Sequence, residues 1–195
     1  MLEGKRKQSV GSLHKVEAGT LRAILVEGIV KNQFVFGLNV ITTSLAVRYL
    51  DRFLGSNRFD VQPVQGWVYH LVANACQTIA VKFQETVRVD NETIQRHVDI
   101  AFDRVCVLKM ESLVLKELAW SLNSVVPHTY IPRLLTLLGF QGEEFSRLLG
   151  RSHVYALSIL YDVNFVRWAP SVVVRKPNHR DTDGRKTSSP PPPPP

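Results

Sequence analysis

Apolar residues recur every three or four positions along most of this 195-residue chain, and that spacing most constrains its fold. Between residues 38 and 53 the apolar stripe consists of Leu38, Ile41, Leu45, Ala46, Tyr49, Leu50 and Phe53. This interval places side chains on one face of an α-helix. No segment alternates apolar and polar residues for long enough to predict a strand. The sequence therefore predicts an all-α protein.

Similar stripes, and the breaks between them, set the expected helix bounds. The predicted helices cover residues 17–31, 38–53, 63–84, 93–100, 103–118, 128–138 and 143–160, with a short apolar piece at 171–174. The helix over 103–118 is apolar around most of its circumference, which is typical of the central helix of a bundle. We therefore expect the other helices to pack around it.

The two ends of the chain differ from its middle. Residues 1–16 are polar and basic, which predicts a flexible lead-in, and residues 175–195 are polar, basic and end in six prolines, which predicts a disordered tail. Residues 1–22 carry five basic and two acidic side chains, and so do residues 175–195, which leaves the stretch between them +1 of the total +7. Because nucleic-acid-binding domains usually carry their basic charge on the folded part, we do not expect nucleic acid as a partner.

The usual catalytic and metal-binding patterns are missing from the sequence. It has no glycine-rich phosphate loop, no nucleophile elbow and no histidine pair at zinc spacing. Cys76 and Cys106 lie in apolar helical runs, so we interpret both as buried, reduced thiols. No apolar run approaches the ~18 residues of a membrane span. We therefore expect a protein of the nucleus and cytoplasm that is not an enzyme and needs no metal, cofactor or membrane.

Two charged residues lie where apolar ones are expected. At about 100° per residue, Glu111 falls in the middle of its helix's apolar arc, and Lys82 falls on the apolar arc of the helix over 63–84. An unpaired charge on such a face is costly. Either the two charges pair with each other, or Lys82 reaches out to solvent at the helix end. Alternatively, both charges flank an apolar surface patch that a partner covers.

Four segments, two of which contain these charges, resemble helix motifs of the cyclin family and occur in the family's order. They are residues 21–25 (LRAIL), 45–54 (LAVRYLDRFL), 79–86 (IAVKFQET) and 109–115 (KMESLVL). Trp67 and the stretches 118–120 and 125–131 look most like plant D-type cyclins. The resemblance covers residues 17–174.

This resemblance implies a five-helix cyclin box over residues 17–122 and, over residues 127–174, a second cyclin domain truncated to about two helices. It implies a regulatory subunit that binds and activates a cyclin-dependent serine/threonine kinase and controls the G1/S transition of the cell cycle. It also admits kinase inhibitors or substrates as partners. Two alternatives stay open: a degenerate cyclin that binds the kinase without activating it, and a cyclin-fold transcription factor that contacts DNA.

The resemblance also implies roles for matching positions. The positions that match the kinase interface are Lys82, Phe83, Glu111, Leu115, Trp120 and Leu122. The positions that match a substrate-docking groove are Leu21, Ile24, Leu25 and Gly28. Because Gly28 stands where the family has tryptophan, we expect this groove to be degenerate. Arg22 and Asp51 match a buried ion pair that joins the first two helices.

Overall fold

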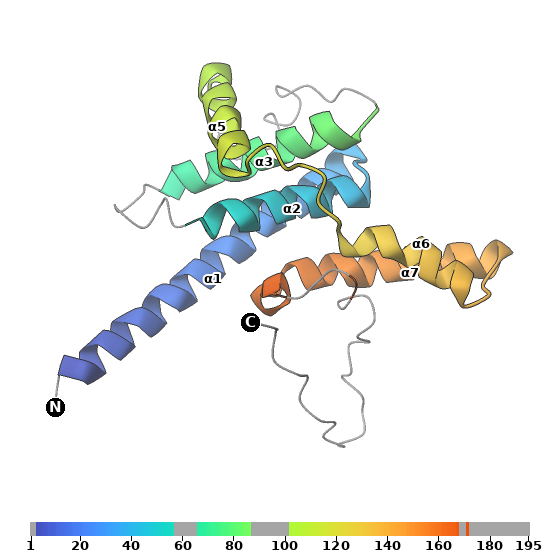
Figure 1. The fold of residues 1–195 in the computed structure, drawn as a ribbon, viewed down its shortest axis with the longest axis horizontal. Coiled ribbons are helices and arrows are strands. Elements are labelled where there is room, and N and C mark those ends of the chain that lie inside the picture. Colours follow the sequence, from blue (N-terminus) through green and yellow to red (C-terminus); the bar gives the residue numbers. More distant parts are fainter. Residues whose placement is uncertain (1–2, 57–65, 87–101, 168–170, 172–195) are drawn as a thin grey trace.

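The computed structural model describes residues 3–56, 66–86, 102–167 and 171 (Figure 1). In chain order its elements are α1 (Glu3–Phe36), α2 (Val40–Leu54), α3 (Gly66–Gln84), α5 (Arg104–Glu117), α6 (Pro127–Leu137), α7 (Gly142–Leu160) and the 3-10 helix η1 (Val163–Arg167). These described residues contain no strand, which confirms the all-α prediction. None of the described helices combines the length and the apolar character that crossing a bilayer requires. The helix predicted over 93–100 and the tail predicted over 175–195 lie outside the described residues.

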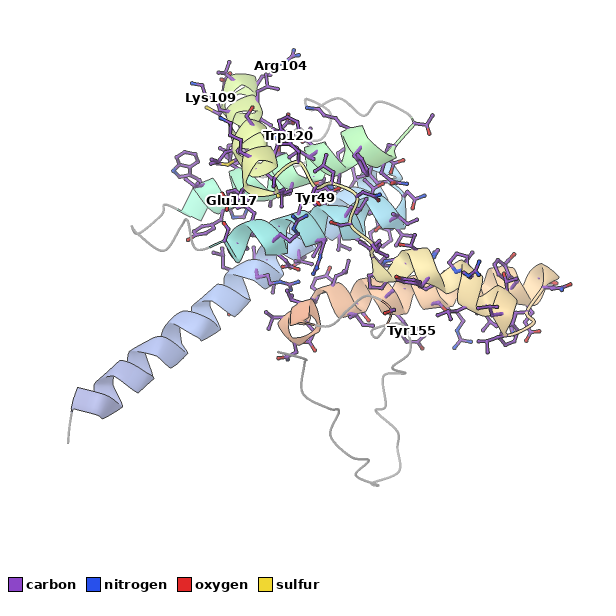
Figure 2. The ribbon with its side chains drawn as sticks, viewed as in Figure 1. Tyr49, Arg104, Lys109, Glu117, Trp120 and Tyr155 are labelled. Atoms are coloured by element: carbon purple, nitrogen blue, oxygen red, sulfur yellow. The ribbon has the colours of Figure 1, made fainter. Side chains whose placement is uncertain are left out.

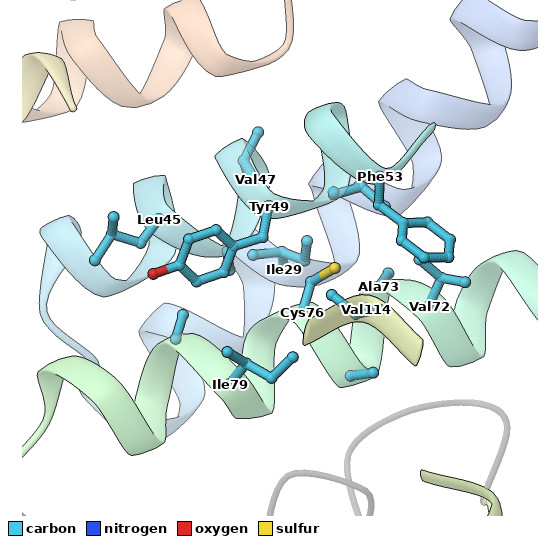
Figure 3. Packing of buried hydrophobic residues seen from close by; sticks show 14 of the residues in the cluster. Ile29, Leu45, Val47, Tyr49, Phe53, Val72, Ala73, Cys76, Ile79 and Val114 are labelled. Carbon is cyan, nitrogen blue, oxygen red and sulfur yellow. The ribbon is translucent and has the colours of Figure 1, made fainter. Parts of the chain in front are cut away.

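The main core lies where α1, α2 and α3 pack together, and α5 packs across α3 (Figure 1). Its buried side chains include Leu25, Ile29, Leu45, Tyr49, Leu50, Phe53, Val72, Cys76, Ile79, Val114 and Leu118. Figure 3 shows side chains of α2 and α3 interleaved within this core. Removing this apolar surface from water supplies the main driving force for the fold.

The central helix of this bundle is α3 rather than α5, so the expectation for residues 103–118 is wrong. All residues of α3 from Leu71 to Val81 are buried. The buried residues of α5 are Val107, Glu111 and Val114. Small side chains on α3, such as those of Ala75 and Ala80, let neighbouring helices approach from several sides. The presence of apolar residues around most of a helix therefore did not identify the central helix.

The first helix is longer than its apolar stripe predicts. It begins at Glu3, whereas the composition of residues 1–16 predicts a flexible lead-in. Once a helix has formed, each further residue adds a backbone hydrogen bond, so helix can extend into a segment that has no apolar stripe. The N-terminal part of α1 projects away from the other helices (Figure 1).

Helices α6 and α7 form an antiparallel hairpin that packs beside α2 (Figure 1). The hairpin has a small core of its own, formed by Ile131, Leu135 and Ala156. A polar contact joins it to α2, because Ser44 Oγ lies 2.6 Å from Nδ1 of His128. The rings of His128 and His153 lie side by side, with their centroids 5.5 Å apart. The second helical unit expected over 127–174 thus contains α6, α7 and η1, and its bounds stay a prediction.

The two cysteines have different surroundings. Cys76 is buried in α3, and burial raises the pKa of its thiol. Cys106 is exposed, so the prediction of a buried thiol is wrong at this position. Because α5 buries only one side of its surface among the described residues, an apolar sequence neighbourhood does not ensure burial there. Both thiols are free.

Candidate functional site

Lys82 and Glu111, the two charges on apolar arcs, meet where α5 packs on α3. The Nζ atom of Lys82 lies 2.8 Å from Oε1 and 2.7 Å from Oε2 of Glu111. The Glu111 side chain is 8 % exposed, whereas the Lys82 side chain is 56 % exposed. The carboxylate is therefore buried and is held by a lysine whose side chain is more than half exposed. The two charges do pair, and the pair lies at the surface.

The apolar side chains expected beside this pair fall into two kinds. Phe83 follows Lys82 at the end of α3 and is 47 % exposed, and Trp120, just beyond α5, is 68 % exposed. Leu115 and Leu122 instead lie partly buried against the main core. Figure 2 shows Trp120 beside α5 and over α3. Phe83 thus follows the lysine of the ion pair, Trp120 lies just beyond the helix that carries Glu111, and both rings are exposed. Leu115 and Leu122 hold the segments that carry Glu111 and Trp120 against the core.

Trp120 belongs to a left-handed turn that ends α5. The φ angle is 49° at Ala119 and 58° at Trp120, a region that residues with a side chain rarely adopt. The N–H of Ala119 donates to the carbonyl of Lys116, and the N–H of Trp120 donates to that of Leu115, both at 3.0 Å. This is the Schellman hydrogen-bond pattern, in which glycine is the usual left-handed residue. The Ala-Trp sequence gives no local signal for it.

Two side chains of α2 hold the backbone of this turn. The hydroxyl of Tyr49 donates to the carbonyl of Leu122 at 2.6 Å. The guanidinium of Arg52 donates to the carbonyls of Ser121 at 2.7 Å and of Leu118 at 3.2 Å. Burial raises the pKa of Tyr49 to about 12, so its hydroxyl stays a donor at neutral pH. Sequence reasoning missed both roles, and the only local signal is their spacing of three residues, which places them on one helix face.

Arg22 of α1 is buried and bonds to α2 and to the end of α7. Its Nε lies 2.7 Å from Oδ1 of Asp51, and its Nη2 lies 3.0 Å from Oδ2, which makes a bidentate pair between α1 and α2. Its Nη1 also donates to the carbonyls of Leu160 at 2.9 Å and Tyr161 at 3.3 Å. These carbonyls end α7, where the helix dipole favours a cation. The resemblance implied the pair with Asp51, but the contact with α7 was not foreseen.

The four groove positions do not lie on one open surface. Leu25 is buried and Leu21 is partly buried, and both pack into the main core. Ile24 and Gly28 are exposed on the outer side of α1. A Cβ added at Gly28 would meet no atom within 4 Å, so no described neighbour forms a wall there. This face of α1 therefore offers Ile24 without the large side chain that a groove at this position would need.

The exposed lysine and aromatic rings give this site the character of a recognition surface. The described residues hold no cluster of three His, Cys, Asp or Glu side chains that could bind a metal ion. A charged pair and large exposed aromatic rings are the side chains that protein interfaces use for register and affinity. The arrangement around Lys82, Glu111 and Trp120 can therefore bind another protein.

Comparison with known proteins gives a family and a set of relatives. Residues 3–123 match the family described as "Cyclin, N-terminal domain". Cyclin-D3-1 of Arabidopsis thaliana is 28 % identical over 170 residues, which cover 87 % of this chain and 45 % of the relative. Cyclin-D1-2 of Oryza sativa subsp. japonica is 30 % identical over 153 residues, which cover 78 % and 42 %. G1/S-specific cyclin-D1 of Danio rerio is 32 % identical over 129 residues, which cover 66 % and 43 %.

These matches show the family of the chain and how much of its relatives' length the chain spans. The chain spans less than half the length of the D-type cyclins named above. The X-ray structure of a viral cyclin from herpesvirus saimiri superposes with a TM-score of 0.70, covering 80 % of this chain and 66 % of that one. At 17 % identity that likeness supports the cyclin fold alone. The family match covers more than half of the chain, and its relatives are mostly plant D-type cyclins, so the chain belongs to the cyclin family.

Proposed function

We propose that this chain is a regulatory subunit, without catalytic activity of its own, that binds and activates a cyclin-dependent serine/threonine kinase and acts at the G1/S transition. The contact surface is the region around Lys82, Glu111, Phe83 and Trp120. Membership of the cyclin family and the D-type relatives support the kind of partner. Its location in the nucleus and cytoplasm, and inhibitors or substrates as further partners, stay predictions.

The observation that carries this proposal is the half-exposed ion pair between α3 and α5. The Glu111 carboxylate is buried and already paired, so a partner does not have to desolvate it. Lys82 keeps one N–H donor for the partner, because Glu111 accepts from two of its three and the lysine side chain is 56 % exposed. The exposed rings of Phe83 and Trp120 supply apolar area that a kinase element can cover. Activation then follows if this surface binds the active kinase conformation better than the inactive one.

The test is binding of the Lys82→Ala, Glu111→Ala double variant to a purified plant cyclin-dependent kinase. Changing both residues avoids leaving a buried carboxylate unpaired, so the variant should keep its fold. We expect affinity to fall about 30-fold or more, since loss of a desolvated charge contact costs roughly 2–5 kcal/mol. The matched control removes the exposed pair Glu27–Lys31, whose atoms lie 2.9 Å apart on α1. Equal binding by both variants and the parent chain would contradict the proposed surface.

A kinase assay separates activation from binding alone. The open face of α1 around Ile24 and Gly28, where the expected substrate groove has no wall, favours the second candidate function, a degenerate cyclin that binds the kinase without activating it. Phosphorylation of a histone-like protein by the purified complex decides between the two functions. A complex that forms but leaves the kinase inactive would favour the degenerate cyclin.

A further inference from the structure

We infer that Tyr49 and Arg52 of α2 are positioning residues that fix the left-handed turn after α5 and thereby present Trp120 to the protein partner. This inference rests on the proposed function, because Trp120 is part of the proposed kinase contact surface. Neither residue touches the partner in this scheme. Both act through the backbone of residues 118–122.

The turn needs outside support. Two successive residues with side chains, Ala119 and Trp120, both have positive φ angles. Such conformations are disfavoured for L-residues and persist where the surroundings determine the backbone. The local Schellman hydrogen bonds end α5, and the carbonyls of Leu118 and Leu122 accept the backbone N–H groups of Ser121 and Ser124. The side chains of α2 add a second donor to each of these two carbonyls and a donor to the carbonyl of Ser121.

The support comes from α2 on both sides of Trp120. Arg52 binds the carbonyl of Leu118 before the tryptophan and the carbonyl of Ser121 after it. Tyr49, whose side chain is fully buried, binds the carbonyl of Leu122. The backbone is therefore bound to α2 two residues before Trp120 and one and two residues after it.

The indole of Trp120 lies at the surface. It is 68 % exposed, although tryptophan is among the residues that gain most from burial. Figure 2 shows it beside α5, while Tyr49 lies on α2. An aromatic side chain on a fixed backbone makes an effective anchor, because little conformational freedom is lost on binding.

If the hydrogen bonds from Tyr49 and Arg52 only stabilise the end of α5, the binding experiment should give a different result. In that case loss of Arg52 would weaken the partner complex whether or not Trp120 is present. If Arg52 acts through Trp120, its loss matters only while the indole is there. A double-mutant cycle separates the two, because residues that act through one another are not additive.

The experiment compares Arg52→Gln and Tyr49→Phe in the parent chain and in the Trp120→Ala chain, with binding to a purified plant cyclin-dependent kinase as the readout. We expect Arg52→Gln to lower affinity about tenfold in the parent and less than about twofold in the Trp120→Ala chain. Arg52→Lys should restore part of the loss. Arg48→Gln, on the same helix, is the matched control. Equal losses in both backgrounds, or no loss in the parent, would overturn the inference.

A second measurement needs no kinase. In a chain whose only tryptophan is Trp120, made by Trp67→Phe and Trp168→Phe, the fluorescence anisotropy of the indole reports how firmly it is held. Tyr49→Phe removes a single hydroxyl, so it should lower the anisotropy while the helix content, measured by circular dichroism, is kept. Unchanged anisotropy would overturn the positioning role. If the parent chain bound no kinase, the proposed function would fail, and the anisotropy would still decide whether the α2 ties hold Trp120.

Discussion

Helices α5 and α6 end in the same hydrogen-bond pattern but reach it by different means. The N–H groups of Ala119 and Trp120 bond back into α5, and those of Gly139 and Phe140 bond back into α6 at 3.0 and 3.1 Å. The left-handed position of α6 is a glycine with φ 85°, whereas that of α5 is an alanine with φ 49°. Glycine adopts this conformation without a steric penalty, and alanine does not.

The difference lies in what surrounds each turn. The last residue before the left-handed position is Leu118 at the end of α5 and Leu138 at the end of α6. Leu118 is 1 % exposed and Leu138 is 71 % exposed. The α5 turn is therefore set by tertiary contacts, namely Leu118 in the core and the bonds from α2, whereas the α6 turn is set by its own glycine. In the part of the chain that the structure describes, Ala119 and Trp120 are the non-glycine residues with positive φ, and strain beside an exposed tryptophan is typical of a functional segment.

Truncation of the two leucines should give the largest contrast. Leu118→Ala removes buried methyl groups from the main core, so we expect a loss of about 3 kcal/mol in the free energy of unfolding. Leu138→Ala changes an exposed side chain and should stay within about 0.5 kcal/mol of the parent. Urea denaturation measures both. Similar losses for the two variants would mean that the α5 turn does not depend on the core.

Lowering the pH should destabilise the α6–α7 hairpin before it affects the turn after α5. Burial lowers the pKa of His128 in α6 from 6.5 to about 4. Between these values the unfolded chain binds the proton and the folded chain does not, so stability falls as the pH falls. We expect a loss of about 2 kcal/mol between pH 7.5 and 5 from this group. Tyr49, with its pKa raised to about 12, does not titrate in that range.

Thermal melting at pH 7.5 and at pH 5 measures this effect in the parent chain and in His128→Asn. Asparagine keeps a polar side chain beside Ser44 but does not titrate. The variant should lose less stability than the parent on acidification. The same pH dependence in both chains would show that His128 is not the group responsible.

Much of the fold follows from local sequence, because each helix carries its own apolar stripe. The same stripes placed Lys82 and Glu111 on apolar faces, and the structure pairs them. Gly139 likewise marks the end of α6 by its conformational freedom. These features are set within a few residues of chain, so periodicity and turn chemistry reveal them.

The remaining features depend on residues far apart in the chain. Arg22 bonds to the carbonyl of Leu160, 138 positions away, and no local pattern encodes that contact. The left-handed conformation of Ala119 depends on Arg52, which lies on another helix. The choice of α3 as the central helix likewise depends on how closely its neighbours approach. Sequence therefore located the charges of the candidate site but not the turn that presents its tryptophan.

Exchanging glycine and alanine at the left-handed positions 139 and 119 should give the smallest changes in the free energy of unfolding. It is also the most direct test of the difference between the two turns. Gly139→Ala should cost about 1 kcal/mol, and because an added Cβ meets no atom within 4 Å, the cost comes from backbone conformation alone. Ala119→Gly should raise stability by up to about 1 kcal/mol, since glycine relieves the left-handed strain but adds freedom to the unfolded chain. Urea denaturation again measures both.

The sign of the two changes matters more than their size. If Ala119→Gly lowered stability, the α5 turn would carry no strain for glycine to relieve. The hydrogen bonds from Tyr49 and Arg52 would then add stability to the turn without being needed to hold its left-handed conformation. If it raised stability while lowering the fluorescence anisotropy of Trp120, the alanine would be costing the free protein stability in return for a more firmly held tryptophan.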